Sequence, residues 1–437
     1  MAFKIVIILF AMILSYGIVK WKGFSVELSI LTTAIVGGIT GAFFYAPPWG
    51  ELFRHLVEGT FTYLDIVLVF STATIFMSIL SESGAVNFVV KRTIKSFFHN
   101  RVFSLILLMF IILVPGALTG AGSVSVLVVG TPVVLALRYL GITEKKVAAI
   151  LFIVAGLSAA APPVNIWAMI LSAGTAIPYV GFELTLGIPI LILGIFTVLF
   201  LGLKKEKEVN LEKALQEIPE APEGMNWWRV ILPFVVFFGL IIISRIWPFG
   251  LPFMGLPLQF VLAAITALLL SPKKMNILVL SRETVKRLLP LLATVTVVGV
   301  LQQIMTVTGV RGLLSYLVIS APLVLILIAL PVIIPLSEGL LAYGGAAIVG
   351  IPLVWFFDSI GLHATVAIAA LSLMWPLGDG VPPTALIGRL TIMVADYKGS
   401  YWSFIKTTWV PWIVITAVAM LMIIYSTELS FLVRWSM

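Results

Sequence analysis

The chain contains no cysteine and carries little charge. Only 11% of its 437 residues are Asp, Glu, Lys or Arg, whereas about 25% is usual for a soluble domain. Without cysteine, disulfide bonds and thiolate chemistry are excluded, and the redox state of the compartment stays open. The three histidines, His55, His99 and His363, are scattered and lack the spacing of metal ligands. We therefore assign the histidines no role.

The motifs of common hydrolases and ATPases are also absent. The sequence has no G-K-[ST] phosphate loop, no H-E-x-x-H and no G-x-S-x-G. ATP-driven pumping needs the first motif, zincin chemistry needs the second, and elbow-type esterases need the third. We therefore do not expect an enzyme.

Long apolar runs are the main feature that is present. Hydrophobic residues make up 61% of the chain, and the mean hydropathy is +1.17. Runs of about 20 apolar residues can cross a hydrocarbon core of about 30 Å. The expected fold is therefore an all-α polytopic protein in a lipid bilayer. We assign the net charge of +8 to cytoplasmic loops and not to nucleic-acid binding. Full spans are predicted near 3–20, 27–46, 61–81, 146–175, 184–203, 230–247, 257–271, 285–304, 363–394 and 408–426.

The two halves of the sequence repeat the same Gly and Pro positions. Pro115, Gly130, Pro132, Gly141, Pro162 and Pro163 recur 220 positions later as Pro335, Gly350, Pro352, Gly361, Pro382 and Pro383. A looser match pairs Gly84 with Gly309. These coincidences predict an internal duplication. The first repeat covers 1–203, a polar cytoplasmic linker covers 204–229, and the second repeat covers 230–437.

Each predicted repeat has one re-entrant hairpin, at 102–138 and 312–357, and one broken helix, at 146–175 and 363–394. Five crossings and one hairpin per half invert the second half relative to the first. The charges agree with this scheme, because it places all but five of the 27 basic residues on one side, as the positive-inside rule requires. The five exceptions are Lys4, Arg54, Arg245, Arg311 and Arg434. Both termini are then external.

The tip of the first hairpin, Thr119 to Ser123, consists of small residues. Glycine allows positive φ and close approach of the backbone, and Thr and Ser supply hydroxyl oxygens. Irregular backbone at membrane depth must be packed in protein or must face a cavity. The helix that follows presents its positive end in mid-membrane, where it can hold an anion.

A Pro-Pro pair follows each hairpin, in "SAAAPPVN" at 158–165 and "PLGDGVPPT" at 376–384. Two prolines remove two amide donors and push the preceding residues out of helical geometry. A helix that breaks there leaves carbonyl oxygens free to coordinate a small cation. A simple proline kink is the alternative for one such pair, and the repetition favours a site.

Few ionisable residues fall inside the predicted spans, and such residues are costly there. Asp379 lies in the second broken helix between Gly378 and Gly380, and Glu338 lies at the second hairpin tip. Both are candidates for cation or proton binding. A helix cap is the alternative for Asp379, and a position facing the external vestibule is the alternative for Glu338. Asn165, after the first Pro-Pro pair, is a candidate side-chain ligand. Arg138 and Arg389 suit a carboxylate substrate.

These motifs carry a resemblance. The segment "GALTGAGSVSVLVVGTPVVLALRYLGITEKKVAAILFIVAGLSAAAPPVNIWAMI" resembles the large membrane subunit (DctM) of tripartite ATP-independent periplasmic (TRAP) transporters, and "SIGLHATVAIAALSLMWPLGDGVPPTALIG" looks like its second-repeat counterpart. The resemblance covers about 60–400. It implies an elevator-type carrier in the cell inner membrane that couples Na⁺ (or H⁺) to an organic acid. It also implies a small four-helix membrane subunit and a periplasmic solute-binding protein as partners.

The resemblance also implies the site residues. The cation ligands it implies are Thr119, Gly120, Gly122, Ala161 and Pro162 in the first repeat, and Gly339, Gly344, Gly345, Gly378 and Asp379 in the second; from their own positions we add Glu338 and Gly380 as candidates. The implied substrate contacts are Thr119, Ser123, Ser125, Asn165, Tyr343 and Thr384. The chain departs from the family at the second tip, where "LLAYGG" replaces the usual acidic residue.

Two functions remain open at this point. The favoured one is a symporter of Na⁺ (or H⁺) with a small organic anion. The alternative is a stand-alone cation/proton antiporter, or another ion-coupled anion symporter, with the same architecture. An antiporter would transport without any organic substrate and would depend on Asp379.

Overall fold

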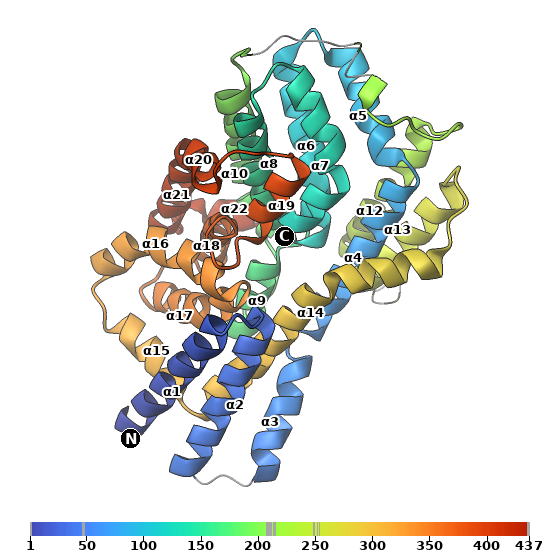
Figure 1. Cartoon of the computed structure of the whole chain (residues 1–437). Helices are drawn as coiled ribbons and strands as arrows, with labels where there is room; N and C mark the ends of the chain where they lie inside the picture. The colour runs from blue at the N-terminus through green and yellow to red at the C-terminus, as the bar shows by residue number, and fades with distance from the viewer. Residues whose placement is uncertain are drawn as a thin grey trace.

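A computed structural model describes residues 2–45, 49–206, 212, 216–247, 250, 252 and 254–434. Within these ranges the chain forms helices and turns and no β-strand (Figure 1). By length and composition, nine of the described helices can cross a membrane, or up to ten if the bent pair at 401–424 counts as one span. The prediction of an all-α polytopic membrane protein is confirmed.

One group of helices packs around the long helix α14, which runs diagonally through Figure 1. We call it the α14 group. Its members are α1 (Ala2–Trp21), α2 (Val26–Tyr45), α3 (Trp49–Phe61), α4 (Leu64–Glu82), α12 (Trp227–Ile246), α13 (Leu256–Leu270) and α14 (Ile277–Val307). Helix α14 contacts α2, α3 and α4, and α13 contacts α4 and α12.

The second group packs around α8 and α18, and we call it the α8 group. Its members are α6 (Arg101–Thr119), α7 (Gly122–Tyr139), α8 (Glu144–Ala160), α9 (Ile166–Thr175), α10 (Phe182–Gly202), α16 (Leu323–Leu341), η1 (Ala346–Gly350), α17 (Ile351–Ser359), α18 (Ala364–Gly378), α19 (Leu386–Val394), α20 (Tyr401–Thr407), α21 (Trp409–Ile424), η2 (Glu428–Ser430) and α22 (Phe431–Arg434). Every residue of α8 from Val147 and of α18 from Thr365 is buried. These two helices therefore face protein on all sides.

Two short helices, α5 (Ala85–Phe97) and α15 (Val310–Ile319), contact both groups. Each begins after a left-handed glycine, Gly84 or Gly309, with φ of +83° and +77°. Helix α15 corrects one predicted boundary. The second hairpin, predicted at 312–357, has its arms at 323–359, because the chain bends at Ser320–Pro322 and leaves 310–319 as a separate helix. Helix α3 was not predicted at all.

Positions 220 residues apart share uncommon backbone conformations. Gly141 and Gly361, in the loops before the broken helices, have φ of +80° and +85°. The Pro162–Pro163 and Pro382–Pro383 bonds are both cis. The helices are interrupted at both Pro-Pro pairs, since α8 and α9 are separated at 161–165 and α18 and α19 at 379–385.

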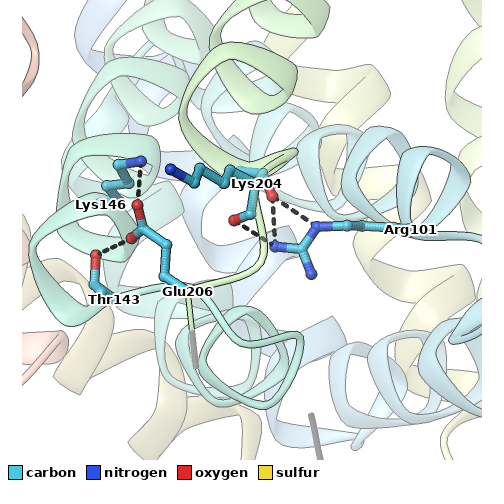
Figure 2. A network of polar contacts seen from close by, with 6 residues as sticks. Arg101, Thr143, Lys146, Lys204 and Glu206 are labelled. Carbon is cyan, nitrogen blue, oxygen red and sulfur yellow. Dashed lines mark hydrogen bonds and ion pairs between the residues drawn. The ribbon is translucent and has the colours of Figure 1, made fainter. Parts of the chain in front are cut away.

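A polar clamp joins the ends of α6, α8 and α10 to the start of the linker (Figure 2). The Arg101 guanidinium donates to the carbonyls of Gly202 (2.8 Å) and Lys204 (3.2 Å). Glu206 accepts from Lys146 (2.7 Å) and from the Thr143 hydroxyl (2.9 Å). These two hydrogen bonds lower the pKa of Glu206 below its usual value, and the bond from Lys146 has the larger effect. The clamp places these helix ends on one face of the molecule.

The far end of the linker lies on the same face. Lys91 of α5 pairs with Glu220 at 2.9 Å, and Gly84 packs against Pro222. Two linker lysines that we expect on the cytoplasmic side, Lys207 and Lys213, lie outside the described residues. That this face is cytoplasmic stays a prediction.

Candidate functional site

A cavity of about 530 Å³ lies between the α14 group and the α8 group. One wall comes from α2, α4 and α14, and the other from α7, the second hairpin and the second break. The lining is mixed, with both charged and apolar side chains. Its polar and ionisable members are Lys20, Glu27, Thr74, Ser78, Ser81, Glu82, Ser123, Glu283, Thr284, Arg287, Thr294, Glu338, Tyr343, Asp379, Thr384 and Arg389.

The cavity opens toward the face that carries the linker. Its lining includes Glu82, at the end of α4, and Arg287, both of which are exposed. Glu82 forms an ion pair with Lys273. Gly84, two residues beyond Glu82, contacts linker residue Pro222. The mouth and the linker therefore share one side, and the buried residues of the second hairpin form the far end.

The first hairpin tip contributes to the cavity through the start of α7. Gly120 ends α6 with φ of +71°, a conformation that favours glycine. Added side-chain atoms there would also meet Ile166 at 2.7 Å. Gly122 and Ser123 then line the cavity. The tip thus packs on α9 and presents the first turn of α7 to the open space.

Two predicted hydroxyl ligands of this tip are used inside the hairpin. The Thr119 hydroxyl is buried, donates to the Pro115 carbonyl at 2.7 Å and accepts from the amide of Ala121 at 3.4 Å. Ser125 donates to the carbonyl of Ile112 on α6. Neither residue lines the cavity.

The first break lies outside the cavity and is closed by Asn165. Its side chain accepts from the amide of Ala168 and donates to the carbonyl of Ala160, both at 2.9 Å. Its backbone amide donates to the Tyr179 hydroxyl at 3.0 Å, and that hydroxyl donates to Pro163 at 3.1 Å. Asn165 therefore caps α9 and ties it to α8. Ala161 and Pro162 belong to this closed turn and do not line the cavity either.

The second hairpin brings a buried carboxylate to the cavity. Glu338 of α16 is 1% exposed, lines the cavity and accepts a hydrogen bond from the Trp167 indole at 2.8 Å. Tyr343 also lines the cavity, with its ring 5.3 Å from that of Trp167. The three predicted glycines of this tip fill packing positions instead: Gly339 lies against Val381, Gly344 against Val298 and Gly345 against Ser337.

The second break provides the remaining predicted groups. Asp379 and Thr384 line the cavity. Gly378 packs against Pro335 and against Glu338, where an added Cβ would lie 2.5 Å from the Glu338 Cβ. The carbonyl of Gly380 accepts from the Tyr401 hydroxyl at 2.8 Å. This close packing brings the Asp379 segment and Glu338 together.

The structure gathers some predicted residues and separates others. Gly122, Ser123, Glu338, Tyr343, Asp379 and Thr384 meet at one cavity. Thr119, Gly120, Ser125, Ala161, Pro162, Asn165, Gly339, Gly344, Gly345, Gly378 and Gly380 support it from outside the lining. In the described part of the chain, no three His, Asp or Glu residues are grouped as they would be for a transition metal.

The two arginines proposed for a carboxylate differ in position. Arg389 lines the cavity and donates to the carbonyl of Pro383 at 2.9 Å. Arg138 does not line the cavity and donates to the carbonyl of Ala395. Only Arg389 is placed to meet a bound solute.

Sequence reasoning missed Trp167 and Arg287. Trp167 is fully buried two residues after Asn165, where it looks like any apolar span residue. Arg287 was counted as a charge on the cytoplasmic side because it lies at the very start of the predicted span 285–304, whereas α14 begins at Ile277 and carries Arg287 into the cavity wall. A cluster of Glu283, Thr284 and Arg287 on successive turns was the available signal.

Comparisons with known proteins identify the fold. No protein-family model and no curated protein matches the sequence. Among solved structures, the chain is similar to the YdaH transporter of Alcanivorax borkumensis, whose topology is described as unusual. The TM-score is 0.60 at 13% identity, and the match covers 86% of this chain and 88% of that one. The chain is a multi-pass membrane protein that has the fold of a membrane transporter.

Proposed function

We propose that the chain is a secondary active transporter that carries a small organic anion through the cavity and couples this to Na⁺ or H⁺. The observation that carries the proposal is the cavity itself. It lies between two helix groups, opens to one face and ends at buried Asp379 and Glu338. Cavities of this volume suit small metabolites.

Several groups support an anion as cargo. The first residues of α7 and α19 line the cavity, through Ser123 and Leu386, and helix N-termini attract negative charge. Arg389 lies beside them. Arginine recognises carboxylates through paired N–H donors. A coupled cation at Asp379 would offset the negative charge of a carboxylate substrate.

The division into two helix groups supports an elevator mechanism. In this mechanism the α8 group would carry the hairpins and breaks across the membrane against a stationary α14 group, with α5 and α15 as connectors. The structure would then represent the state open to the cytoplasm. We include in the proposal two antiparallel repeats, at 1–203 and 230–437, and external termini.

The role of a TRAP large subunit is the most specific form of the proposal. It adds a small four-helix subunit and a periplasmic solute-binding protein as partners. Uptake by the chain alone would contradict this form and would leave the carrier proposal standing.

The test is uptake of radiolabelled carboxylates into proteoliposomes, with and without an inward Na⁺ or H⁺ gradient. We expect gradient-dependent uptake of at least one acid. Arg389→Gln should raise the KM for that acid about tenfold or more, because a charge-assisted contact is lost. Arg138→Gln is the matched control and should leave the KM unchanged. Absence of uptake for every acid under both gradients would sink the stand-alone carrier, and its absence also after a small four-helix subunit and a solute-binding protein are added would sink the whole proposal.

A cation/proton antiporter is the second candidate, and the charge of the cavity favours it. Five carboxyl groups line the cavity, against three basic side chains. The acids are Glu27, Glu82, Glu283, Glu338 and Asp379, and the bases are Lys20, Arg287 and Arg389. An antiporter would collapse a pH gradient on addition of Na⁺ without an organic solute, as a pH-sensitive dye inside proteoliposomes would report.

A further inference from the structure

Glu338 and Trp167 connect the two halves of the chain inside the protein. Trp167 lies on α9, directly after the first break, and Glu338 lies near the end of α16 in the second hairpin. The indole Nε1 donates to Glu338 Oε2 at 2.8 Å, with the tryptophan fully buried. The same indole packs against Tyr343, which lies between the end of α16 and the start of η1. One side chain of the first half therefore holds both sides of the second tip.

The hydrogen bond offsets part of the cost of burying the Glu338 carboxylate. A carboxylate taken out of water is strongly destabilised unless donors or a cation compensate it. The indole N–H is the one donor to the Glu338 carboxylate in the described structure, and it is bound to a single oxygen. Glu338 still lines the cavity. The bond thus fixes the direction of the carboxylate and leaves it short of a positive partner. Its titratable neighbours are Asp379 and Tyr343. The other charged side chains in the lining are Lys20, Glu27, Glu82, Glu283, Arg287 and Arg389.

The neighbouring residue offers an internal comparison. Ser337 accepts a hydrogen bond from a second buried indole, that of Trp375 on α18, at 3.2 Å. Two tryptophans therefore hold adjacent residues of α16. Trp375 comes from the second half itself and holds a neutral hydroxyl, whereas Trp167 comes from the first half and holds a charge. Ser337 does not line the cavity.

We infer that Trp167 is a positioning residue for the coupling cation: its indole orients Glu338 so that the free carboxylate oxygen, together with Asp379, binds Na⁺ at the second tip. This inference rests on the proposed function and adds to it a cross-link between the halves. Carboxylate oxygens are suitable ligands for a hard cation. Partners that orient a ligand commonly change metal affinity by about 10- to 100-fold.

The experiment measures Na⁺ binding to the full chain without any organic solute. Purified protein in detergent is titrated with NaCl at constant ionic strength and pH, with choline chloride as the balancing salt. The readout is the rise in Tm, since a ligand that binds only the folded state stabilises it. For the wild type we expect a saturable rise. For Trp167→Phe we expect the half-saturating Na⁺ concentration to increase about tenfold.

Two further variants separate positioning from packing. Trp375→Phe, the matched control, lowers the Tm without Na⁺ but leaves the half-saturating concentration unchanged. Glu338→Gln keeps an oxygen for the indole, so the protein folds, but the response to Na⁺ is lost. In the Glu338→Gln background, Trp167→Phe should have no further effect on the Na⁺ response, because both changes act on one interaction.

The outcomes are decisive. Equal shifts for Trp167→Phe and Trp375→Phe, or no shift for either, would overturn the inference. An unresponsive wild type would also overturn it, even where uptake assays support the carrier. If Trp167→Phe does not fold, a normal Na⁺ response in Glu338→Gln still contradicts the inference. A wild type that binds Na⁺ but transports nothing would instead contradict the proposed function.

Discussion

The two Pro-Pro breaks share a backbone conformation, but the first is closed by hydrogen bonds and the second faces the cavity. After each cis bond, the chain donates a backbone hydrogen bond to its own hairpin, from Val164 to Ala117 (3.0 Å) and from Thr384 to Gly339 (3.1 Å). The first break is then closed by Asn165. In the second, 220 positions later, Ala385 takes the place of Asn165, and the break faces the cavity. Two breaks with the same backbone conformation thus provide one structural connection and one candidate site.

The two halves also differ in which element carries the glycine at the contact between hairpin and broken helix. In the first half the glycine is on the hairpin, where Gly116 faces Ser158 of α8. In the second half the glycine is on the broken helix, where Gly378, at the position equivalent to Ser158, faces the backbone of Pro335. Both arrangements allow close approach, but only the second brings a carboxylate, Glu338, to the contact.

The largest expected effect comes from removing the acid that distinguishes the second break. Asp379→Asn should reduce Na⁺-driven uptake about 100-fold, because a ligand charge is lost at the cation site. Proteoliposome uptake is the measurement. Asp358→Asn, at the exposed end of α17 and outside the cavity lining, is the control and should keep wild-type uptake. Near-normal uptake in Asp379→Asn would remove the distinction between the two breaks.

The different surroundings of the two glycines predict that a second substitution can restore the stability of one glycine variant and not of the other. Gly378→Ala and Gly116→Ala should each destabilise the protein by about 1–3 kcal/mol through overpacking. Ser158→Gly should restore Gly116→Ala, because the new methyl group there collides with the serine side chain. Gly378→Ala collides with the Pro335 carbonyl, so deleting a side chain gives no such relief. Thermal unfolding checks this, and equal rescue of both would contradict it.

The closed first break predicts a smaller effect that concerns stability alone. Asn165→Ala removes a helix cap and a buried hydrogen bond, and we expect a loss of about 1–2 kcal/mol. The Na⁺ concentration for half-maximal stabilisation should stay at the wild-type value. A changed Na⁺ response would mean that the first break also takes part in cation binding.

The smallest expected effect on stability comes from the contacts of the loops that precede the broken helices. The amide of Glu206 donates to the carbonyl of Gly141, and in the second half the hydroxyl of Thr427 donates to the carbonyl of Gly361. Of these two contacting residues, only Glu206 carries a charge. Because the folded pKa of Glu206 is lowered, its contribution is complete above its unfolded pKa and is lost as the pH falls through the folded value.

Glu206→Gln should therefore remove the part of the folding stability that depends on the ionised Glu206 carboxylate. This part is below about 1 kcal/mol for a partly exposed ion pair. The measurement compares the Tm of wild type and variant at neutral pH and below the unfolded pKa. The two proteins should differ at neutral pH and converge in acid. A difference that persists in acid would indicate a packing effect instead.

The sequence predicted the architecture more completely than the site. Helix ends at Gly84, Gly120, Gly141 and the Pro-Pro pairs follow from local backbone chemistry, which is why the chain turns at Gly120 and the helices end at the Pro-Pro pairs where the sequence places these breaks. That the α6–α7 pair is re-entrant stays a prediction. Asn165 shows where this reasoning stops. Its position after the Pro-Pro pair suggested a ligand, but its hydrogen bonds depend on Tyr179 and Ala160, whose approach the sequence does not reveal.

The α14 wall of the cavity was the part least accessible to prediction. Charges such as Arg287 and Glu27 are ordinary interfacial residues by local pattern, and only the packing of α2 and α14 places them in the lining of the same cavity as Thr384. Likewise, the contact of Trp167 with Glu338 spans 171 positions. Long-range pairs of this kind carry no periodic signal.

The complete burial of α8 and α18 has a consequence for energy conservation. Both helices are buried among other helices up to the residues where they end, so acyl chains do not reach the backbone of α8 and α18. In the proposed carrier, an ion would approach Asp379 through the mouth of the cavity, because the α18 helix that leads to Asp379 is covered by protein. Such cover would limit leak of the coupling ion, since the ion gradient could then discharge only through the compartment that also binds the cargo.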